Sequence, residues 1–151
     1  QCTIYFRYYL NQALKASGLG DQFLDNLQIW RDQMALGLTT WAEMPEPSRS
    51  DCHAWGASPN IEFYRILLGI DSDAPGFRKI RIAPSLGKLK EVSGTIPHPL
   101  GSVTAVYKLD ERGEGTARLV LPEGTTGIFI WDGKEIPLKP GEQVISLSSR
   151  H

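Results

Sequence analysis

Apolar residues recur at helical spacing along the first half of the chain. Steps of three and four residues between them, followed by glycines, predict an amphipathic helix near the N-terminus. A second helix is predicted from Asp21, which can cap it, to Gly37, which suits its exit. A third is predicted to begin near His53 or Pro59 and to run to Leu68, with a broad apolar face. The apolar positions of the first two helices are Ile4, Tyr8, Leu10, Ala13 and Leu14, then Phe23, Leu24, Leu27, Trp30, Met34 and Leu38.

The pattern changes near Gly76, beyond which apolar and polar residues alternate in short runs bounded by glycine and proline. Alternation of this kind predicts strands. Asp132 and Gly133 follow the apolar run 128–131 and indicate a hairpin turn. Several short strands at regular spacing favour an antiparallel sandwich or jelly roll. The predicted strands are 79–82, 89–97, 102–109, 116–121, 128–131, 135–138 and 143–147.

Helices and strands that are segregated along the chain predict an α+β protein of two units. We expect helices in residues 1–75 and a β-sandwich in residues 76–151. Three helices are few for a self-sufficient domain. Their apolar faces are therefore expected to contact the rest of a larger helical domain, or a second copy of the chain. The chain starts with Gln1 and enters a helical pattern at once, which favours a piece of a longer protein.

The charge balance gives no indication of a nucleic-acid or membrane partner. Sixteen basic and seventeen acidic residues leave a formal net charge of -1, whereas electrostatic binding to phosphates needs a basic surface. The densest basic run, residues 78–81, alternates with apolar positions and is typical of the solvent face of a strand. No apolar run approaches the ~20 residues that span a bilayer. Cys2 and Cys52 lack metal-ligand spacing, so two free thiols are predicted.

The segment 38–59 concentrates aromatic and ionisable residues between two helices. Loops on rigid scaffolds often carry functional groups. Aromatic faces can cover the apolar side of a pyranose while carboxylates and histidine bind its hydroxyls, so the composition suits a sugar site. Each residue also has a purely structural interpretation. In that case Glu43 is a solvated loop carboxylate, His53 is a helix-end residue bonded to backbone, and Trp41 and Trp55 are core anchors.

Other residues of the segment have local structural interpretations. Asp51 is expected to cap the third helix. Arg49 is expected to pair with Asp51 or Glu46 at the surface. One histidine among scattered carboxylates lacks the spacing of metal ligands, so neither a metal site nor a cofactor is predicted.

Residues 39–43 (Thr-Thr-Trp-Ala-Glu) and 48–55 (Ser-Arg-Ser-Asp-Cys-His-Ala-Trp) resemble motifs of glycoside hydrolase family 78, the bacterial α-L-rhamnosidases. In that family, the last helices of an (α/α)6 barrel are followed here by a C-terminal β-sandwich, and the resemblance implies the same fold. Gly56 and Ser58 depart from the commoner form, in which serine and histidine often stand at these positions. The resemblance continues through residues 67–70, 74–77, 80–84 and 94–101.

The resemblance implies an inverting hydrolase of terminal α-L-rhamnose, with a general acid and a general base roughly 6.5–9.5 Å apart. Glu43 matches the general base, His53 matches a residue that contacts rhamnose, and Trp41 and Trp55 line or support the pocket. No residue matches the family's general acid, so the chain alone is expected to have little or no activity. An extracytoplasmic location is favoured over a cytoplasmic one.

Two other functions remain open for the strand half. It could act alone as a carbohydrate-binding module, with Tyr107, Phe129 and Trp131 as candidate contacts. Tyr107 and Phe129 are expected in the core of alternating strands, whereas Trp131 is expected to be exposed beside a turn. Alternatively, the strand half only packs against the barrel end or an oligomer interface, and we prefer this structural role.

Overall fold

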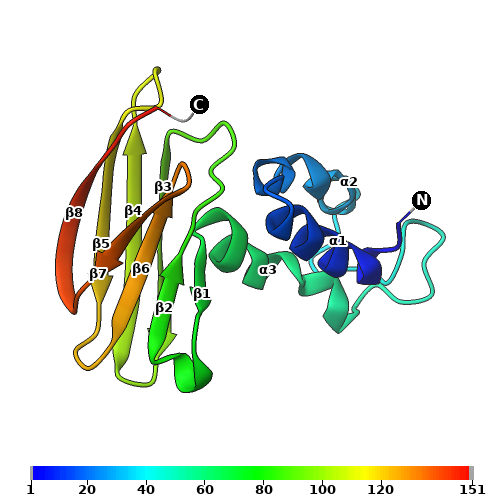
Figure 1. The fold of residues 1–151 in the computed structure, drawn as a ribbon. Coiled ribbons are helices and arrows are strands. Elements are labelled where there is room, and N and C mark those ends of the chain that lie inside the picture. The colour runs from blue at the N-terminus through cyan, green and yellow to red at the C-terminus, as the bar shows by residue number, and fades with distance from the viewer. Residues whose placement is uncertain (1, 150–151) are drawn as a thin grey trace. The chain divides into compact units, whose positions relative to one another are not determined.

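The computed structural model describes residues 2–149 and divides into two compact units, Gln1–Phe63 and Tyr64–His151. The first unit is helical, and the second consists largely of strands (Figure 1). The predicted α+β class, with helices first and strands second, is therefore confirmed. Over residues 2–149, no helix combines the length and apolar character that crossing a membrane requires.

Helix α1 (Ile4–Ala16) forms where the sequence predicts it. The hydroxyl of Thr3 accepts a hydrogen bond from the backbone N–H of Phe6 at 3.2 Å and thereby caps the helix. Gly18 follows the helix with a φ of 76°, a left-handed conformation that glycine adopts without steric cost. The local sequence therefore defines both ends of α1.

Helix α2 (Gln28–Ala35) is shorter than the predicted second helix, because two 3₁₀ turns, Gly20–Gln22 and Asp25–Leu27, precede it. Asp21 lies in the first of these turns and does not cap α2, so that prediction is wrong. The Asn26 side chain donates a hydrogen bond of 3.2 Å to the carbonyl four residues earlier. Asparagine and aspartate side chains form such bonds to nearby backbone groups in turns, so these residues favour a turn over a regular helix.

The third helical segment consists of a 3₁₀ turn (Ala54–Ala57), helix α3 (Pro59–Glu62) and a π-helical stretch (Phe63–Leu67). Pro59 stands at the start of α3, where its missing N–H removes no helical hydrogen bond. The helix therefore begins after Ser58, and the prediction that Asp51 caps it is wrong.

The core of the first unit mixes apolar and polar side chains. Met34, which was predicted to belong to the apolar stripe of the second helix, is 63% exposed and lies outside the core. Polar groups in a core need partners, so they restrict how the helices pack. The buried side chains of this unit include Ile4, Phe23, Leu27, Trp30 and Ala42, together with the polar residues Asn11, Gln33 and Glu62.

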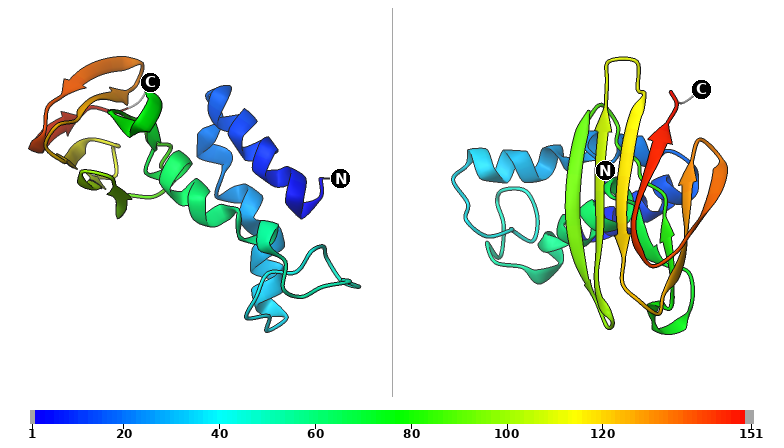
Figure 2. Two further views of the ribbon diagram at one scale, coloured as in Figure 1. Left: turned by 90° about the horizontal axis from the view of Figure 1, so that it is seen from below. Right: turned by 90° about the vertical axis from the view of Figure 1, so that its left-hand side faces the viewer.

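Within the described residues, eight strands form two four-stranded sheets, with the orders β1-β2-β6-β7 and β3-β4-β5-β8. The sheets form separate layers (Figures 1 and 2), which confirms the predicted sandwich. All seven predicted strands are present, and β1 is additional because its three residues are too few to show alternation. The strands are β1 (Ile70–Ser72), β2 (Lys79–Ile82), β3 (Glu91–His98), β4 (Gly101–Leu109), β5 (Gly115–Leu121), β6 (Thr126–Trp131), β7 (Lys134–Leu138) and β8 (Gly141–Leu147).

Strand pairing is antiparallel except between β2 and β6, which run parallel with Lys79 opposite Thr126. The hairpin between β6 and β7 turns at Asp132 and Gly133, with φ values of 48° and 72°. Two consecutive positive φ values are typical of a type I′ turn, whose twist matches that of the strands. The predicted hairpin is therefore confirmed.

Alternation along β2 confirms the interpretation of the basic run. Ile80 and Ile82 are buried, whereas Lys79 and Arg81 are exposed. The period of two residues places the charges on the solvent side of the sheet. Fully buried side chains of the other strands include Val103, Ala105, Tyr107, Ala117, Leu119 and Phe129.

Trp131 does not lie on the surface. Its side chain is 5% exposed, and its indole N–H donates a hydrogen bond of 2.8 Å to the carbonyl of Ser148. The ring is stacked with Phe129 at a centroid distance of 6.4 Å. The prediction of an exposed Trp131 is wrong because the strand places this position on its buried side.

The backbone at Leu68 and Gly69 approaches other parts of the second unit closely. The hydroxyl of Tyr107 donates a buried hydrogen bond of 2.8 Å to the carbonyl of Leu68. The carbonyl of Gly69 accepts a hydrogen bond of 2.9 Å from the N–H of Ala83. A Cβ atom at position 69 would lie 2.2 Å from the carbonyl carbon of Ala83, so no side chain fits there.

We expect Gly69→Ala to destabilise the protein more than Gly133→Ala. Both glycines have positive φ values, of 76° and 72°, so each alanine pays about 1–2 kcal/mol of backbone strain. Only Gly69 also faces a steric overlap, which adds roughly 1–3 kcal/mol, whereas nothing lies within 4 Å of a Cβ at Gly133. Urea unfolding of both variants measures the free energy of unfolding. An equal decrease in the two variants would contradict the close approach of Gly69 to Ala83.

Candidate functional site

Two side chains of α2 hold the segment that carries the predicted site residues. The indole N–H of Trp30 donates a buried hydrogen bond of 2.7 Å to the carbonyl of Gly56. The amide oxygen of Gln33 accepts one of 2.9 Å from the backbone N–H of Ala42. From Ala42 to His53 the segment has no helix or strand. These side-chain bonds therefore replace the backbone ladder that would otherwise fix it.

The segment folds back on itself through backbone hydrogen bonds. The N–H of His53 donates to the carbonyl of Trp41 at 2.8 Å, and the N–H of Glu43 donates to the carbonyl of Ser50 at 2.8 Å. These bonds bring the two motifs predicted from the sequence, around residues 39–43 and 48–55, into direct contact. Glu43, His53 and Trp41 therefore belong to one compact loop.

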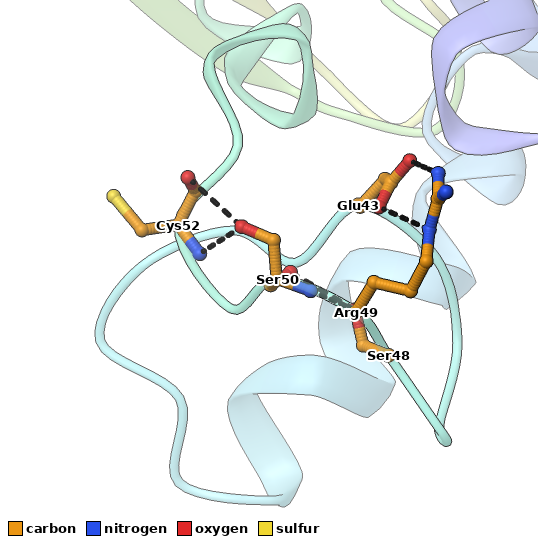
Figure 3. Close-up of polar contacts among 5 residues, drawn as sticks. All are labelled: Glu43, Ser48, Arg49, Ser50 and Cys52. Atoms are coloured by element: carbon orange, nitrogen blue, oxygen red, sulfur yellow. Dashed lines mark hydrogen bonds and ion pairs between the residues drawn. The ribbon is translucent and has the colours of Figure 1, made fainter.

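Glu43 and Arg49 form an ion pair across the loop (Figure 3). Arg49 Nε donates to Oε2 of Glu43 at 3.1 Å, and Nη2 donates to Oε1. The Glu43 side chain is only 10% exposed, whereas that of Arg49 is 76% exposed. The hydrogen bond to Glu43 and its charge raise the pKa of Arg49. The predicted partners of Arg49, Asp51 and Glu46, are wrong, because the fold of the loop presents Glu43 instead.

Serine side chains stabilise the returning part of the loop (Figure 3). The hydroxyl of Ser48 donates to the carbonyl of Ser50 at 2.9 Å, and the hydroxyl of Ser50 donates to the carbonyl of Cys52 at 3.3 Å. Ser48 and Ser50 flank Arg49, so these bonds fix the backbone from which its side chain reaches Glu43. Cys52 is an exposed free thiol, and Cys2 is also free, as predicted.

His53 and Trp55 pack against each other at the end of the loop. Their ring centroids are 4.0 Å apart with an interplanar angle of 50°. Nδ1 of His53 is buried and has no hydrogen-bond partner within residues 2–149. Trp55 is 40% exposed, so it is not the core anchor of the structural interpretation. A buried ring nitrogen without a partner is unusual in a folded protein.

Gly56 explains one departure from the commoner family motif. A Cβ atom at this position would lie 2.6 Å from Cβ of Trp41 and 3.3 Å from the carbonyl oxygen of Ala42. The two backbone segments are therefore too close for the serine that often stands here. The absence of a side chain at Gly56 allows Trp41 to pack directly beside the loop end.

We expect Gly56→Ser to destabilise the protein by roughly 1–3 kcal/mol, because the new Cβ forces Trp41 to move. Ala54→Ser, at an exposed position two residues away, serves as the control and should change the stability by less than about 0.5 kcal/mol. Thermal unfolding monitored by tryptophan fluorescence measures both effects. Equal stability of the two variants would contradict the tight contact between Gly56 and Trp41.

Glu62 is a buried carboxyl that pattern reading did not single out. Its side chain is fully buried, and the Asn11 side-chain N–H donates to its Oε2 at 2.9 Å. Burial raises the pKa of Glu62 to about 7, and the hydrogen bond from Asn11 opposes this rise. In the sequence, the only indication of its burial is its position between the apolar residues Ile61 and Phe63. Glu62 links α3 to α1 and is best described as a structural group.

Glu62 makes stability depend on pH. Between about pH 4.5 and pH 7, the unfolded chain loses this proton while the folded protein keeps it. The free energy of unfolding therefore falls as pH rises through this window, by up to roughly 3 kcal/mol. Glu62→Gln removes this titration, so its stability relative to wild type should rise between pH 4.5 and 7 and then level off. Urea unfolding from pH 4 to 8 tests this, and a constant difference would contradict it.

Ionisable residues do not gather elsewhere in a form that suits a metal. Within residues 2–149, no group of three or more histidine, cysteine, aspartate or glutamate side chains is arranged to hold a metal ion.

The second unit matches a known family. Residues 69–143 match the family model described as "Bacterial alpha-L-rhamnosidase C-terminal domain". A comparison with curated proteins gave no match.

Solved structures resemble a larger part of the chain. The native α-L-rhamnosidase of Aspergillus terreus has a TM-score of 0.81 at 20% identity, over 93% of this chain and 18% of that one. The family 78 rhamnosidase of Bacillus sp. GL1 has a TM-score of 0.71 at 25% identity, over 84% and 16%. The α-L-rhamnosidase of Dictyoglumus thermophilum has a TM-score of 0.67 at 19% identity, over 78% and 17%. The chain thus spans less than a fifth of the length of each.

Helices followed by a two-sheet sandwich define an α+β protein of the kind found in these rhamnosidase structures. Residues 69–143 are a bacterial α-L-rhamnosidase C-terminal domain, and solved rhamnosidase structures, one of them of glycoside hydrolase family 78, resemble most of the chain. The family predicted from the motifs at residues 39–43 and 48–55 is therefore confirmed.

Proposed function

We propose that this chain is the C-terminal part of an inverting enzyme that removes terminal α-L-rhamnose, with Glu43 as general base. The pairing of Glu43 with Arg49 on a compact loop beside His53 is the observation that carries this proposal. In the same proposal His53 contacts the rhamnose, and Trp41 and Trp55 line or support its pocket. The rhamnosidases among the similar structures support the substrate class.

The geometry of Glu43 suits the activation of water. Both of its oxygens accept a hydrogen bond from Arg49, which fixes the plane of the carboxylate. Each carboxylate oxygen has a second lone pair, so one remains for the proton of an attacking water. The largely buried position of Glu43 limits competing contacts with bulk solvent. Arg49 therefore acts as a positioning residue for the proposed base.

The general acid must come from outside the described residues. Inversion needs a second carboxyl group roughly 6.5–9.5 Å from the base, on the opposite face of the sugar. We infer that the helices up to Leu67 are the last ones of an (α/α)6 barrel whose earlier helices supply this acid, and that the strands from β1 onward form the C-terminal sandwich. The exposed apolar side chains of α1 suit contact with those helices.

The sandwich has a structural role in this proposal. Tyr107 and Phe129 are fully buried, and Trp131 is nearly so. None of these three rings can therefore present a face to a sugar without rearrangement of the core. This weakens the alternative of a carbohydrate-binding module that depends on them.

Glu43→Gln in the full-length protein should lower turnover of an aryl α-L-rhamnoside by at least about a hundredfold, because it removes the base. The 151-residue chain alone should show little or no turnover. Release of the aryl group measures both rates, and proton NMR of the released sugar reports inversion.

Glu46→Gln is the matched control for this prediction. Glu46 lies on the same loop, but it is exposed and its carboxylate accepts a hydrogen bond from the backbone N–H of Ser48 instead of from Arg49. Its replacement should leave turnover within about twofold of wild type. Equal losses in the two variants, or full activity of Glu43→Gln, would refute the proposed role of Glu43.

A further inference from the structure

Gln33 is a glutamine in the last turn of α2, and it is only 3% exposed. Its Oε1 accepts the hydrogen bond of 2.9 Å from the backbone N–H of Ala42, whereas its Nε2 is buried and has no hydrogen-bond partner within residues 2–149. Burying an amide costs free energy unless hydrogen bonds replace those made with water. An apolar side chain would avoid this cost, which indicates that the bond to Ala42 has a role besides stability.

The bond from Gln33 reaches the peptide group that joins Trp41 to Ala42. The N–H of this peptide group donates to Gln33. Its oxygen, which is the carbonyl of Trp41, accepts a hydrogen bond of 2.8 Å from the N–H of His53. A peptide group is planar, so a hydrogen bond at each end fixes its orientation. This peptide group is therefore held between α2 and the residue that is proposed to contact the rhamnose.

Glu43, the proposed base, follows this peptide group directly. Its own N–H donates to the carbonyl of Ser50 at 2.8 Å, and Arg49 binds the carboxylate at the other end of the side chain. Ser50 and Arg49 belong to the loop itself, so these two contacts determine the shape of the loop. The contact from Gln33 comes from a helix, and it therefore relates the position of Glu43 to the helical unit.

Trp30 lies three residues before Gln33 on the same face of α2, and it holds a different part of the loop. Its indole N–H donates to the carbonyl of Gly56 at 2.7 Å, and the N–H of Gly56 donates to the carbonyl of His53 at 2.9 Å. When the bond from Gln33 is removed, His53 therefore keeps a second connection to α2. The position of Glu43, in contrast, depends on Gln33.

We propose that Gln33 is a positioning residue for Glu43, which acts by fixing the peptide group between Trp41 and Ala42. The inference rests on the proposed function. It adds a residue of α2 that lies outside the two motifs and outside the match at residues 69–143. A displacement of about 1 Å at a reacting group can lower a rate roughly a hundredfold. Loss of this bond should therefore lower kcat and leave KM nearly unchanged, because His53 keeps its connection through Gly56.

Gln33→Met in the full-length protein tests the inference, because methionine keeps the length of the side chain but has no oxygen that can accept the bond. For an aryl α-L-rhamnoside, kcat should fall at least about tenfold, and KM should change less than about twofold. Gln33→Glu keeps an oxygen acceptor and should restore most of kcat. Circular dichroism gives the folded fraction of each variant, and kcat is expressed per folded enzyme.

Gln28→Met is the matched control, because it makes the same substitution on the same helix. Gln28 is exposed, and its Nε2 donates a hydrogen bond of 2.7 Å to the Asp32 carboxylate instead of binding the loop. Its replacement should leave kcat and KM within about twofold of wild type. A loss of kcat equal to that of Gln33→Met would overturn the inference.

The double variant Gln33→Met, Glu43→Gln separates positioning of the base from a general structural role. Without the base there is nothing for Gln33 to position, so the residual turnover of Glu43→Gln should change less than about twofold when Gln33→Met is added. A loss by the same factor in both backgrounds, or an unchanged kcat in Gln33→Met alone, would overturn the inference and leave the proposed function intact. Full activity of Glu43→Gln would instead overturn the proposed function.

Discussion

The hydrogen bond from the Tyr107 hydroxyl to the carbonyl of Leu68 anchors the segment that precedes β1. Tyr107 belongs to β4 in one sheet, and the next carbonyl, that of Gly69, is bound by Ala83 directly after β2 in the other sheet. Two successive peptide groups are thus fixed to both layers of the sandwich. A buried carbonyl left unpaired would be costly, so both layers must be in place together. The close approach depends on a residue without a side chain at position 69.

Periodicity predicted the sandwich better than the helices. Alternation is a strong signal for strands with one buried face, and β2 and β6 follow it closely. The second helix was predicted too long because Asp25 and Asn26 form a turn that the apolar spacing does not reveal. Trp131 was misplaced because nearness to a turn does not determine exposure, whereas its position in the pleat does.

The residue types of the candidate site were predictable, but their partners were not. Glu43 and His53 were selected from local composition and motif resemblance. That Arg49 would pair with Glu43 depends on how the loop folds back through Ser50, which is a matter of backbone geometry. The support from Trp30 and Gln33 comes from residues that read as ordinary positions of α2. Such hydrogen bonds depend on the tertiary structure and cannot be predicted from the local pattern of apolar and polar residues.

The parallel pairing of β2 with β6 has a consequence for how the sandwich assembles. Lys79 pairs with Thr126, and β3, β4 and β5 of the other sheet are made between them. The first sheet therefore cannot close until the second has largely been synthesised. Pairing between residues so distant in sequence carries a high contact order, which is associated with slow folding. During translation β2 therefore leaves the ribosome before its parallel partner β6 has been made.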